Sequence, residues 1–463
     1  MNRELNNDEI DYLLLHLSHQ APNIKILFNQ HVIYTNHSTC NDTKKIIFTC
    51  SSYPVNTVHL EPIDQLPVLF PVSNDLTRWY TLTNNGTLIF HHDILKSAFY
   101  ILSGWDEAHS TDADEHGRFP HTSSLLYQLD WLGKPLVNYY FEIILNGIKE
   151  YLVFHKTHLD ERKPFNPFAC FISHDVDRIW YHHPREAYWR FKQLLGIDVC
   201  LIPRKKMFNE CLNDLKYFWR YKSKDPWWTM DYLVKTSRAN GMKNTFYLLD
   251  QSQDKQGSRY AFSNPHIQKW SKNLTSPLAE VDIHAPYATI DKPDSLKETI
   301  DHFKAAFGRH PIGVRHHFLR FRYPDTYLLH ESLGLKYDAS FGFAGKPGFR
   351  NGYCLPFMPY DHKANKIINL WVIPLNAMEV TFLNYEKSGW KYFSDSINTM
   401  VDETMKFGGV FSLLWHNCRF DEKSFPGITD FYSKTIKSIH QKGAKGILGS
   451  EIASHMDSLT SGF

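Results

Sequence analysis

Short apolar runs and amphipathic segments alternate regularly from about residue 168 onward, and this alternation constrains the fold more than any other feature. The apolar runs are FACFIS, KNTFYLL, EVDIH, IGVRHHF, INLWVIPL and GGVFSLLWHN. The segments with helical periodicity cover residues 226–241, 264–273, 295–308, 324–334 and 394–406. Strands that alternate with helices along a chain build parallel sheets with crossover helices. The sequence therefore predicts an α/β fold, either a barrel or an open sheet.

Polar residues stand directly after several of these apolar runs. They are Asp175, His284, Arg315, Asp338 and His416. In a parallel barrel the C-terminal ends of the strands meet at one face, and this face carries the active site. Packing alone does not explain polar side chains that recur at strand ends. We therefore expect a functional site at this face.

The chain has 463 residues, which is too long for one ordinary core and favours two domains. Apolar runs near residues 24, 31, 44 and 87 predict short strands or strand–helix alternation, and residues 137–153 are typical of a helix. Residues 160–167 are charged, contain two prolines and suit a linker. We expect a smaller α/β domain over residues 1–163 and a barrel over residues 164–463.

Composition excludes several classes of protein. The formal net charge of +2 gives no reason to expect a nucleic-acid partner. No stretch approaches eighteen apolar residues, so we expect no membrane span. The first residues lack a basic start followed by an apolar run, which predicts a cytoplasmic protein. The seven cysteines form no CxxC pair from Cys40 to Cys418, which argues against a disulfide framework.

Asp175 and Asp177 are two residues apart where the first run of the barrel ends, so on an extended backbone they point to the same side. Two adjacent carboxylates repel each other unless a cation or a proton lies between them. A divalent metal on one carboxylate lets the other remain ionised as a general base. A DxD pair is also common in surface turns, so this pair alone does not decide between the two interpretations.

The remaining polar residues suit the same chemistry. His284 ends an apolar run, and a neutral imidazole there is either a metal ligand or a structural side chain. Arg315 can hold a carboxylate ionised and oriented. His317 shares the face of Arg315, whereas His316 points away. His416 ends the most apolar run and is a candidate general acid.

In their order along the chain, these segments resemble the motifs of polysaccharide deacetylases, which form carbohydrate esterase family four. The matching segments are SHDVD (173–177), DIHAPYA (282–288), VRHHF (314–318) and LLWHN (413–417). Residues 337–361 and the segment DEHGRF (114–119) resemble a bacterial subgroup that carries an additional N-terminal domain. The resemblance therefore covers nearly the whole chain.

The resemblance implies a distorted (β/α) barrel with fewer than eight strands and a bound divalent metal, usually zinc. It implies a hydrolase that removes an N-acetyl group from a sugar or polysaccharide. Carried over residue by residue, Asp175 is the base, Arg315 positions the base and His416 is the acid. Asp177 and His284 are the implied metal ligands.

The chain departs from the family pattern at three places. Ala288 stands where the second motif has another metal-binding histidine, and Asp282 replaces its glycine. His317 replaces the proline of the third motif. Because His317 shares the face of Arg315, we expect it to be the third metal ligand or to hold the metal-bound water by a hydrogen bond. Weaker candidates for that ligand are His174, Asp282 and Thr289.

Other functions stay open at this point. A metal-dependent amidase acting on a small non-sugar C–N bond would use the same residues, and a degenerate barrel would only bind a glycan. A glycosidase with Glu379 and Asp338 as its carboxylate pair leaves the aspartate pair and the histidines unexplained. The insertion from residue 180 to residue 221 is either a lid or a solvated helical decoration. His116 and Arg118 either contact substrate or form a structural ion pair.

Overall fold

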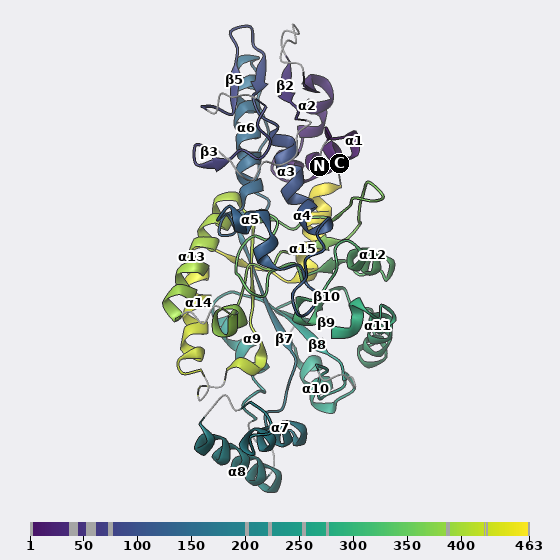
Figure 1. Ribbon diagram of the computed structural model, residues 1–463, viewed down its shortest axis with the longest axis vertical. Helices are drawn as coiled ribbons and strands as arrows, with labels where there is room; N and C mark the ends of the chain where they lie inside the picture. The colour runs from purple at the N-terminus through teal and green to yellow at the C-terminus, as the bar shows by residue number, and fades with distance from the viewer. Residues whose placement is uncertain are drawn as a thin grey trace.

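The computed structural model describes residues 3–36, 45–51, 62–72, 77–199, 203–220, 225–251, 256–274, 277–385, 389–420, 422 and 425–461. Cys40 and Tyr221, both named in the sequence analysis, lie outside these ranges. The molecule is elongated (Figure 1): a smaller α/β part forms one end, a large sheet surrounded by helices forms the middle, and a helical hairpin forms the other end.

The smaller part is built on a four-stranded sheet with the order β1-β2-β6-β5. The strands are β1 (Val32–Thr35), β2 (Ile46–Thr49), β5 (Tyr80–Leu82) and β6 (Leu88–Phe90). β1, β2 and β6 are parallel, and β5 is antiparallel to β6. A separate two-stranded hairpin joins β3 (Pro62–Ile63) to β4 (Leu66–Pro67).

The helices of the smaller part are α1 (Asn7–Ser18), α2 (Ile24–His31), α3 (Ile94–Leu102), α4 (Trp105–Ala108), η1 (His121–Ser123), α5 (Leu125–Gln128) and α6 (Leu136–Phe154). α2 contacts β1, and α6 contacts β5 and β6. Asn6 caps α1 in a capping box with Glu9, which satisfies two free backbone donors. The apolar run near residue 24, an expected strand in one of the two interpretations, is helical: it forms α2 and buries Ile24, Leu27 and Phe28 on one side.

The large sheet has nine strands, with the order β14-β11-β10-β9-β8-β7-β16-β15 and with β17 paired to β7. Five strands are four residues or longer: β7 (Ala169–Val176), β8 (Asn244–Leu249), β9 (Ala279–Ala285), β10 (Gly313–His316) and β16 (Val410–Leu414). The others have two residues: β11 (Tyr337–Asp338), β14 (Trp371–Val372), β15 (Ala377–Met378) and β17 (Lys445–Gly446). All of these pairings are parallel, so the predicted barrel-like α/β fold is confirmed. The sequence predicted fewer than eight strands, which agrees with the five longer strands. The four two-residue strands bring the total in the described residues to nine.

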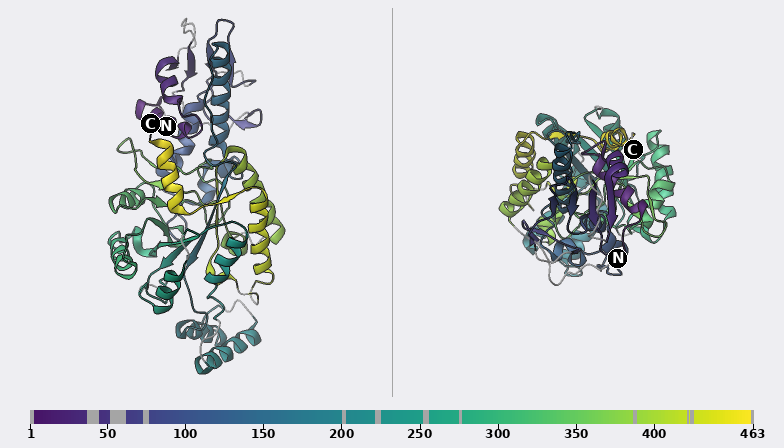
Figure 2. Two further views of the ribbon diagram at one scale, coloured as in Figure 1. Left: turned by 180° about the vertical axis from the view of Figure 1, so that it is seen from behind. Right: turned by 90° about the horizontal axis from the view of Figure 1, so that it is seen from above.

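Crossover helices cover the outside of this curled sheet, as Figures 1 and 2 show. They are α9 (Met230–Ala239), α10 (Pro265–Asn273), α11 (Asp294–Phe307), α12 (Asp325–Ser332), α13 (Trp390–Phe407), α14 (Ile428–Gln441) and α15 (Gly449–Thr460). The shorter elements are η2 (Tyr287–Ile290), η3 (His317–Leu319), β12 (Tyr360–Asp361), β13 (Lys366–Ile367), η4 (Thr381–Tyr385) and η5 (Asn417–Arg419). α11 ends where Gly308 adopts a left-handed conformation, as the sequence predicted. Of the helices in the described ranges, none is long and apolar enough to cross a membrane.

The insertion after β7 forms two helices, α7 (Pro184–Leu194) and α8 (Arg204–Arg220). Inside this hairpin the guanidinium of Arg190 donates to both carboxylate oxygens of Asp214, at 2.7 and 2.6 Å. Met207 of α8 is buried as well. The hairpin projects from the end of the molecule opposite the four-stranded sheet (Figure 1).

The two parts of the chain share one continuous apolar core. Tyr12 of α1 packs on Tyr360, with ring centroids 5.0 Å apart. His16, on the same helix, is fully buried at this junction. Its Nδ1 lies 2.8 Å from the main-chain oxygen of Tyr12, and its Nε2 accepts a hydrogen bond of 3.2 Å from the amide of Met358. The polar contacts of one buried imidazole therefore cross from the smaller part to the barrel.

Candidate active site

The polar residues predicted to share a face do come together. Asp175 lies near the end of β7, His284 near the end of β9 and Arg315 near the end of β10. His416 follows β16, the strand beside β7. Because all these strands run parallel, their C-terminal ends present the side chains to one region.

His284 points its Nε2 atom at two carboxylates. The Nδ1 atom lies 2.7 Å from the main-chain oxygen of Arg315, which can only accept, so Nδ1 carries the proton in the neutral ring. The Nε2 atom, which then bears a lone pair, lies 3.4 Å from Asp175 Oδ2 and 3.4 Å from Asp177 Oδ1. A lone pair facing two carboxylates is repulsive unless a cation or a proton lies among them.

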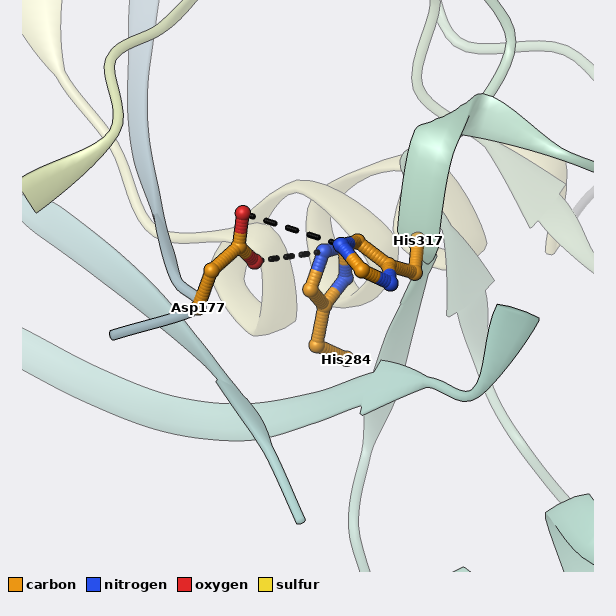
Figure 3. Close-up of side chains that lie close together, drawn as sticks. All are labelled: Asp177, His284 and His317. Atoms are coloured by element: carbon orange, nitrogen blue, oxygen red, sulfur yellow. Dashed lines mark ion pairs between the residues drawn. The ribbon is translucent and has the colours of Figure 1, made fainter. Parts of the chain in front are cut away.

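His317 joins this group from η3, the turn that follows β10. Its Nε2 atom lies 3.7 Å from Asp177 Oδ2, and its ring centroid lies 5.0 Å from that of His284. Figure 3 shows both imidazoles directed toward the Asp177 carboxylate. One ligand atom from each of these three residues lies within 4.8 Å of the others, a spacing suited to a metal ion.

Unsatisfied polar atoms test whether a cation fits here. Among the described residues, buried site atoms that lack a hydrogen-bond partner include Asp175 Oδ1, Asp177 Oδ1 and His284 Nε2. Other such atoms of the site are His317 Nδ1, Arg315 Nε, Arg315 Nη1 and Glu379 Oε2. Buried polar atoms without partners are rare in folded proteins and mark a site for an ion or another functional role. Two imidazoles and a carboxylate are also the donor set that a divalent metal such as zinc accepts. The residues present therefore fit a divalent cation.

The neighbouring charges and burial shift the pKa values of the three cluster residues. Burial alone would raise the pKa of Asp177, but the imidazoles of His317 and His284 outweigh burial and hold this pKa well below its usual value. Burial would lower the pKa of His284, yet the Asp175 and Asp177 carboxylates raise it. For His317, burial dominates and lowers the pKa. A neutral His317 is able to bind a metal.

Arg315 stands behind Asp175. Its side chain is fully buried, and its Nη1 atom lies 3.7 Å from Asp175 Oδ1. Its Nη2 atom donates a hydrogen bond of 2.9 Å to Ser173 Oγ, and its guanidinium lies over the ring of Tyr247 at 5.0 Å. These contacts fix the position of a positive charge beside the Asp175 carboxylate.

His416 faces the aspartate pair from the end of β16, the strand next to β7. Its Nε2 atom lies 4.0 Å from Asp175 Oδ2 and 4.0 Å from Asp177 Oδ2. Its Nδ1 atom lies 2.7 Å from Glu379 Oε1, and the Glu379 side chain is completely buried. Burial alone would lower the pKa of His416, but the Glu379 carboxylate and the two aspartates raise it to about 9. His416 is thus a protonated imidazole at neutral pH and can act as an acid.

A cavity of about 400 Å³ opens over these residues. Its wall includes Asp175, Asp177, His317 and His416. Further lining residues are Glu115, Arg118, Phe318, Leu319, Ala344, Met378, Val380, Asn384, Tyr385, Leu414, Cys418 and Arg419. Glu115 and Arg118 precede the linker, so the smaller part of the chain contributes directly to this wall.

The turn that carries Arg118 also supports the turn that carries His317. Asp114 accepts hydrogen bonds from the amides of His116 and Arg118 and from Arg118 Nε, which closes the first turn. Arg118 Nη1 then donates to the main-chain oxygen of Phe318 at 2.7 Å. Phe318 and Leu319 have positive φ values of 63° and 53°, a costly conformation for such residues that needs this kind of support. Arg118 thus forms an ion pair with Asp114, and it also lines the cavity.

Several candidates from the sequence lie elsewhere. His174 hydrogen-bonds Trp415 and Asn244, Asp282 accepts from Ile312 and Tyr337, and Thr289 contacts Ser295, so none of the three joins the His284 cluster. His316 points away from the site, as predicted, and its Nε2 lies 2.9 Å from His330 Nε2.

Asp338 and Glu379 do not form a facing pair for glycoside hydrolysis. Both side chains are fully buried and have different partners, since Asp338 accepts from Ser340 whereas Glu379 contacts His416. The role of Glu379 beside His416 was missed in the sequence. In the sequence, Glu379 is marked only by its position directly after the short segment Ala377–Met378, which forms β15.

Comparisons with known proteins give a partial match. A model described as a family of unknown function (DUF7033) matches residues 2–152, about a third of the chain. No curated protein matches the chain. Among solved structures, Puue allantoinase aligns at 13% identity over 63% of this chain and 91% of its own, with a TM-score of 0.41.

Two further solved structures resemble the barrel part. The polysaccharide deacetylase Bc1974 from Bacillus cereus aligns at 10% identity, over 60% of this chain and 90% of its own, with a TM-score of 0.29. A CE4 family pseudoenzyme from Bacillus anthracis aligns at 11% identity, over 62% of this chain and 65% of its own, with a TM-score of 0.30. Resemblances this weak say nothing about activity, which has to be argued from the site itself.

Proposed function

We propose that this protein is a metal-dependent hydrolase that removes an N-acetyl group from a sugar or polysaccharide. The observation that carries this proposal is the position of His284 Nε2, a buried atom without a hydrogen-bond partner that lies 3.4 Å from both Asp175 Oδ2 and Asp177 Oδ1. A cation among these three side chains would bind all of them. The order of the four motifs along the chain, which resembles that of polysaccharide deacetylases, supports the same reaction.

In this proposal Asp177, His284 and His317 hold a divalent metal, for which zinc suits the nitrogen-rich donor set. Such a metal, when bound, lowers the pKa of water and polarises an acyl carbonyl. His284 keeps its orientation through the bond from Nδ1 to the Arg315 carbonyl, which fixes the tautomer.

Asp175 is the proposed general base. The guanidinium of Arg315 lies 3.7 Å from its carboxylate and orients it, and the carboxylate accepts the proton of the water that attacks the acetamide carbonyl. His416 is the proposed general acid: its Nε2 faces the same cavity, and Glu379 keeps it protonated from the other side of the ring. It donates its proton to the amine nitrogen as the C–N bond breaks.

Two measurements test this proposal. Elemental analysis of the purified protein should find about one divalent ion per chain, and chitin oligomers should lose acetate in its presence. Asp175→Asn should retain the metal and the fold and lose nearly all turnover, because the base is gone while the ligands remain. Asp301→Asn, an exposed change on α11, is the matched control and should leave the rate unchanged.

Each competing function gives a different result. A protein that binds metal but cleaves only small cyclic amides or ureides is the metal-dependent amidase. A protein that binds glycan without metal and without turnover is the degenerate barrel. Turnover of Asp175→Asn within a few-fold of the wild-type rate would remove Asp175 from its role as base.

A further inference from the structure

The α7–α8 hairpin exposes an unusual amount of apolar surface. Of the seventeen large apolar side chains that are exposed in the described part of the chain, eight lie between residues 188 and 215. They are Tyr188, Phe191, Leu195, Ile197, Val199, Phe208, Leu212 and Leu215. Single exposed apolar residues are normal on a protein surface, but a concentration of them marks an interaction site.

The exposed residues form one stripe on each helix. On α7, Tyr188, Phe191 and Leu195 follow an i, i+3, i+7 spacing and are 51–56% exposed. On α8, Phe208 and Leu215 are separated by seven residues, with Leu212 between them, and are 51% and 64% exposed. Residues at these spacings share one face of a helix. Each helix therefore presents an apolar face to the solvent.

The hairpin does not need this face for its own folding. The inner faces of the two helices already meet through the ion pair of Arg190 with Asp214. In the connection between the helices, Ile197 and Val199 are 65% and 72% exposed. The exposed apolar face of α7 and α8 is therefore available to bind another molecule or a membrane.

Positive charges border this stripe. Lys192 lies one position from Phe191, with its ammonium 5.2 Å from the centroid of the Tyr188 ring. Exposed cations on α8 are Arg204, Lys205 and Lys216, which on a helical wheel flank Phe208, Leu212 and Leu215.

The acidic residues of the two helices have inward partners. Asp214 is bound by Arg190 and His182, and Glu210 accepts a hydrogen bond from Tyr181. Glu186 lies near Arg178 and Arg259, at 3.4 and 3.5 Å. The outward face of both helices is thus apolar and cationic, with the acids turned away from it.

We propose that the α7–α8 hairpin docks on the surface of an anionic lipid bilayer. Helices that lie in a membrane interface combine an apolar face with lysines and arginines along its edge, and the hairpin has this pattern on both helices. A second copy of the chain fits less well, since a symmetric contact would place the cations of the two copies against each other. The hairpin stands clear of the other elements in both side views, so a flat surface can reach it (Figures 1 and 2).

Vesicle sedimentation tests this proposal on the full chain. The wild type should bind vesicles made of equal parts phosphatidylglycerol and phosphatidylcholine at low ionic strength, and bind pure phosphatidylcholine far more weakly. Added salt should weaken binding, because it screens the attraction between the lysines and the lipid. Lys205→Glu with Lys216→Glu should lower the partition coefficient by at least about tenfold.

Variants that replace exposed apolar residues test whether the hairpin inserts into the bilayer or is held only by charge attraction. Phe191→Ser with Phe208→Ser should also lower the partition coefficient at least about tenfold, because two rings no longer enter the interface. Val153→Ser, an exposed apolar change on α6, and Lys297→Glu, an exposed charge reversal on α11, are the matched controls and should bind like wild type. All of these positions are exposed, so circular dichroism should show unchanged folds.

Three outcomes overturn the proposal. In the first, the wild type fails to bind anionic vesicles at low ionic strength. In the second, the hairpin variants bind as tightly as the wild type. In the third, sedimentation without lipid shows a wild-type dimer that the hairpin variants lose, which identifies a second copy as the occupant of the face.

Discussion

Arg118 donates a hydrogen bond of 2.7 Å from Nη1 to the main-chain oxygen of Phe318, although the two residues lie 200 positions apart in the sequence. Phe318 directly follows His317, so this bond anchors the turn that brings the imidazole to Asp177. Arg320, two residues further on, donates from Nε to the main-chain oxygen of His116 at 2.6 Å. The turn before the linker and the turn after β10 therefore hold each other in place.

We predict that Arg118→Ala weakens metal binding without removing any proposed ligand. The turn at Phe318 has positive φ values and loses its anchor, so His317 is held less firmly. Residues that orient ligands typically account for about ten- to a hundredfold in metal affinity, and we expect a loss near the lower end. Competition with a chromophoric chelator measures it.

Two further variants make this test specific. Arg118→Lys keeps the charge but cannot bridge Asp114 and Phe318 in the same way, so its affinity should lie between those of Arg118→Ala and wild type. Arg322→Ala removes an exposed arginine from the same stretch and should have no effect. Wild-type affinity in Arg118→Ala would show that the His317 turn is stable without this anchor.

His317→Ala should lower metal affinity by about tenfold or more, as expected when a protein ligand is lost. His310→Ala, an exposed change shortly before β10, is its control. X-ray absorption on the zinc-loaded wild type should show nitrogen neighbours at about 2.0–2.1 Å, with one fewer in the variant. An unchanged coordination shell in His317→Ala contradicts the ligand assignment.

Glu379→Gln should move the alkaline limb of the pH–rate profile to lower pH. In the wild type the Glu379 carboxylate is the main influence that overcomes burial, and the pKa of His416 is raised to about 9. Without that charge, burial prevails and the imidazole loses its proton at lower pH, so the acid form disappears about one pH unit or more earlier. Glu379→Asp retains the charge and should restore part of the shift, and an unmoved limb in Glu379→Gln contradicts the proposed pairing.

Acidification should destabilise the junction between the two parts of the chain through His16. Burial lowers the pKa of His16 from 6.5 to about 4, against a smaller raising effect of the Tyr12 carbonyl. The unfolded chain therefore takes up this proton first as the pH falls, and the stability contribution present above pH 6.5 is lost between 6.5 and about 4. Each pKa unit corresponds to about 1.4 kcal/mol, so the loss is on the order of 3 kcal/mol.

Urea unfolding at several pH values checks this effect. His16→Gln should be less stable than wild type at pH 7 but should lose less stability on acidification, because its side chain does not titrate. His158→Gln, whose side chain is 87% exposed, is the control and should follow the wild-type pH dependence. Equal slopes for the wild type and His16→Gln would mean that other groups cause the acid sensitivity.

The periodicity of apolar residues and the turn residues were enough to predict the parallel sheet and its helices, because secondary structure depends largely on neighbours close in sequence. The strand ends also predicted that Asp175, His284, Arg315 and His416 would meet. The apolar run near residue 24 was ambiguous because five apolar-rich residues fit a strand as well as one helical face.

Two parts of the site could not be derived from local patterns. The expected extended strand through His317 ends one residue early, and His317 reaches Asp177 from a turn whose shape depends on Arg118, far away in the sequence. Glu379 follows a two-residue strand, and only the tertiary fold brings it to His416. Both contacts are long-range, which a periodic pattern does not encode.

The shared cavity wall constrains how the two parts of this protein can evolve. Because Glu115 and Arg118 line the same cavity as the strand-end residues, the segment before the linker and the barrel cannot be exchanged between relatives as independent modules. A recombinant that joined the barrel to a foreign N-terminal segment would keep every side chain of the strand ends and would still have a differently shaped entrance. Selection on the shape of this cavity therefore acts on Glu115 and Arg118 as well, and the two parts should diverge together.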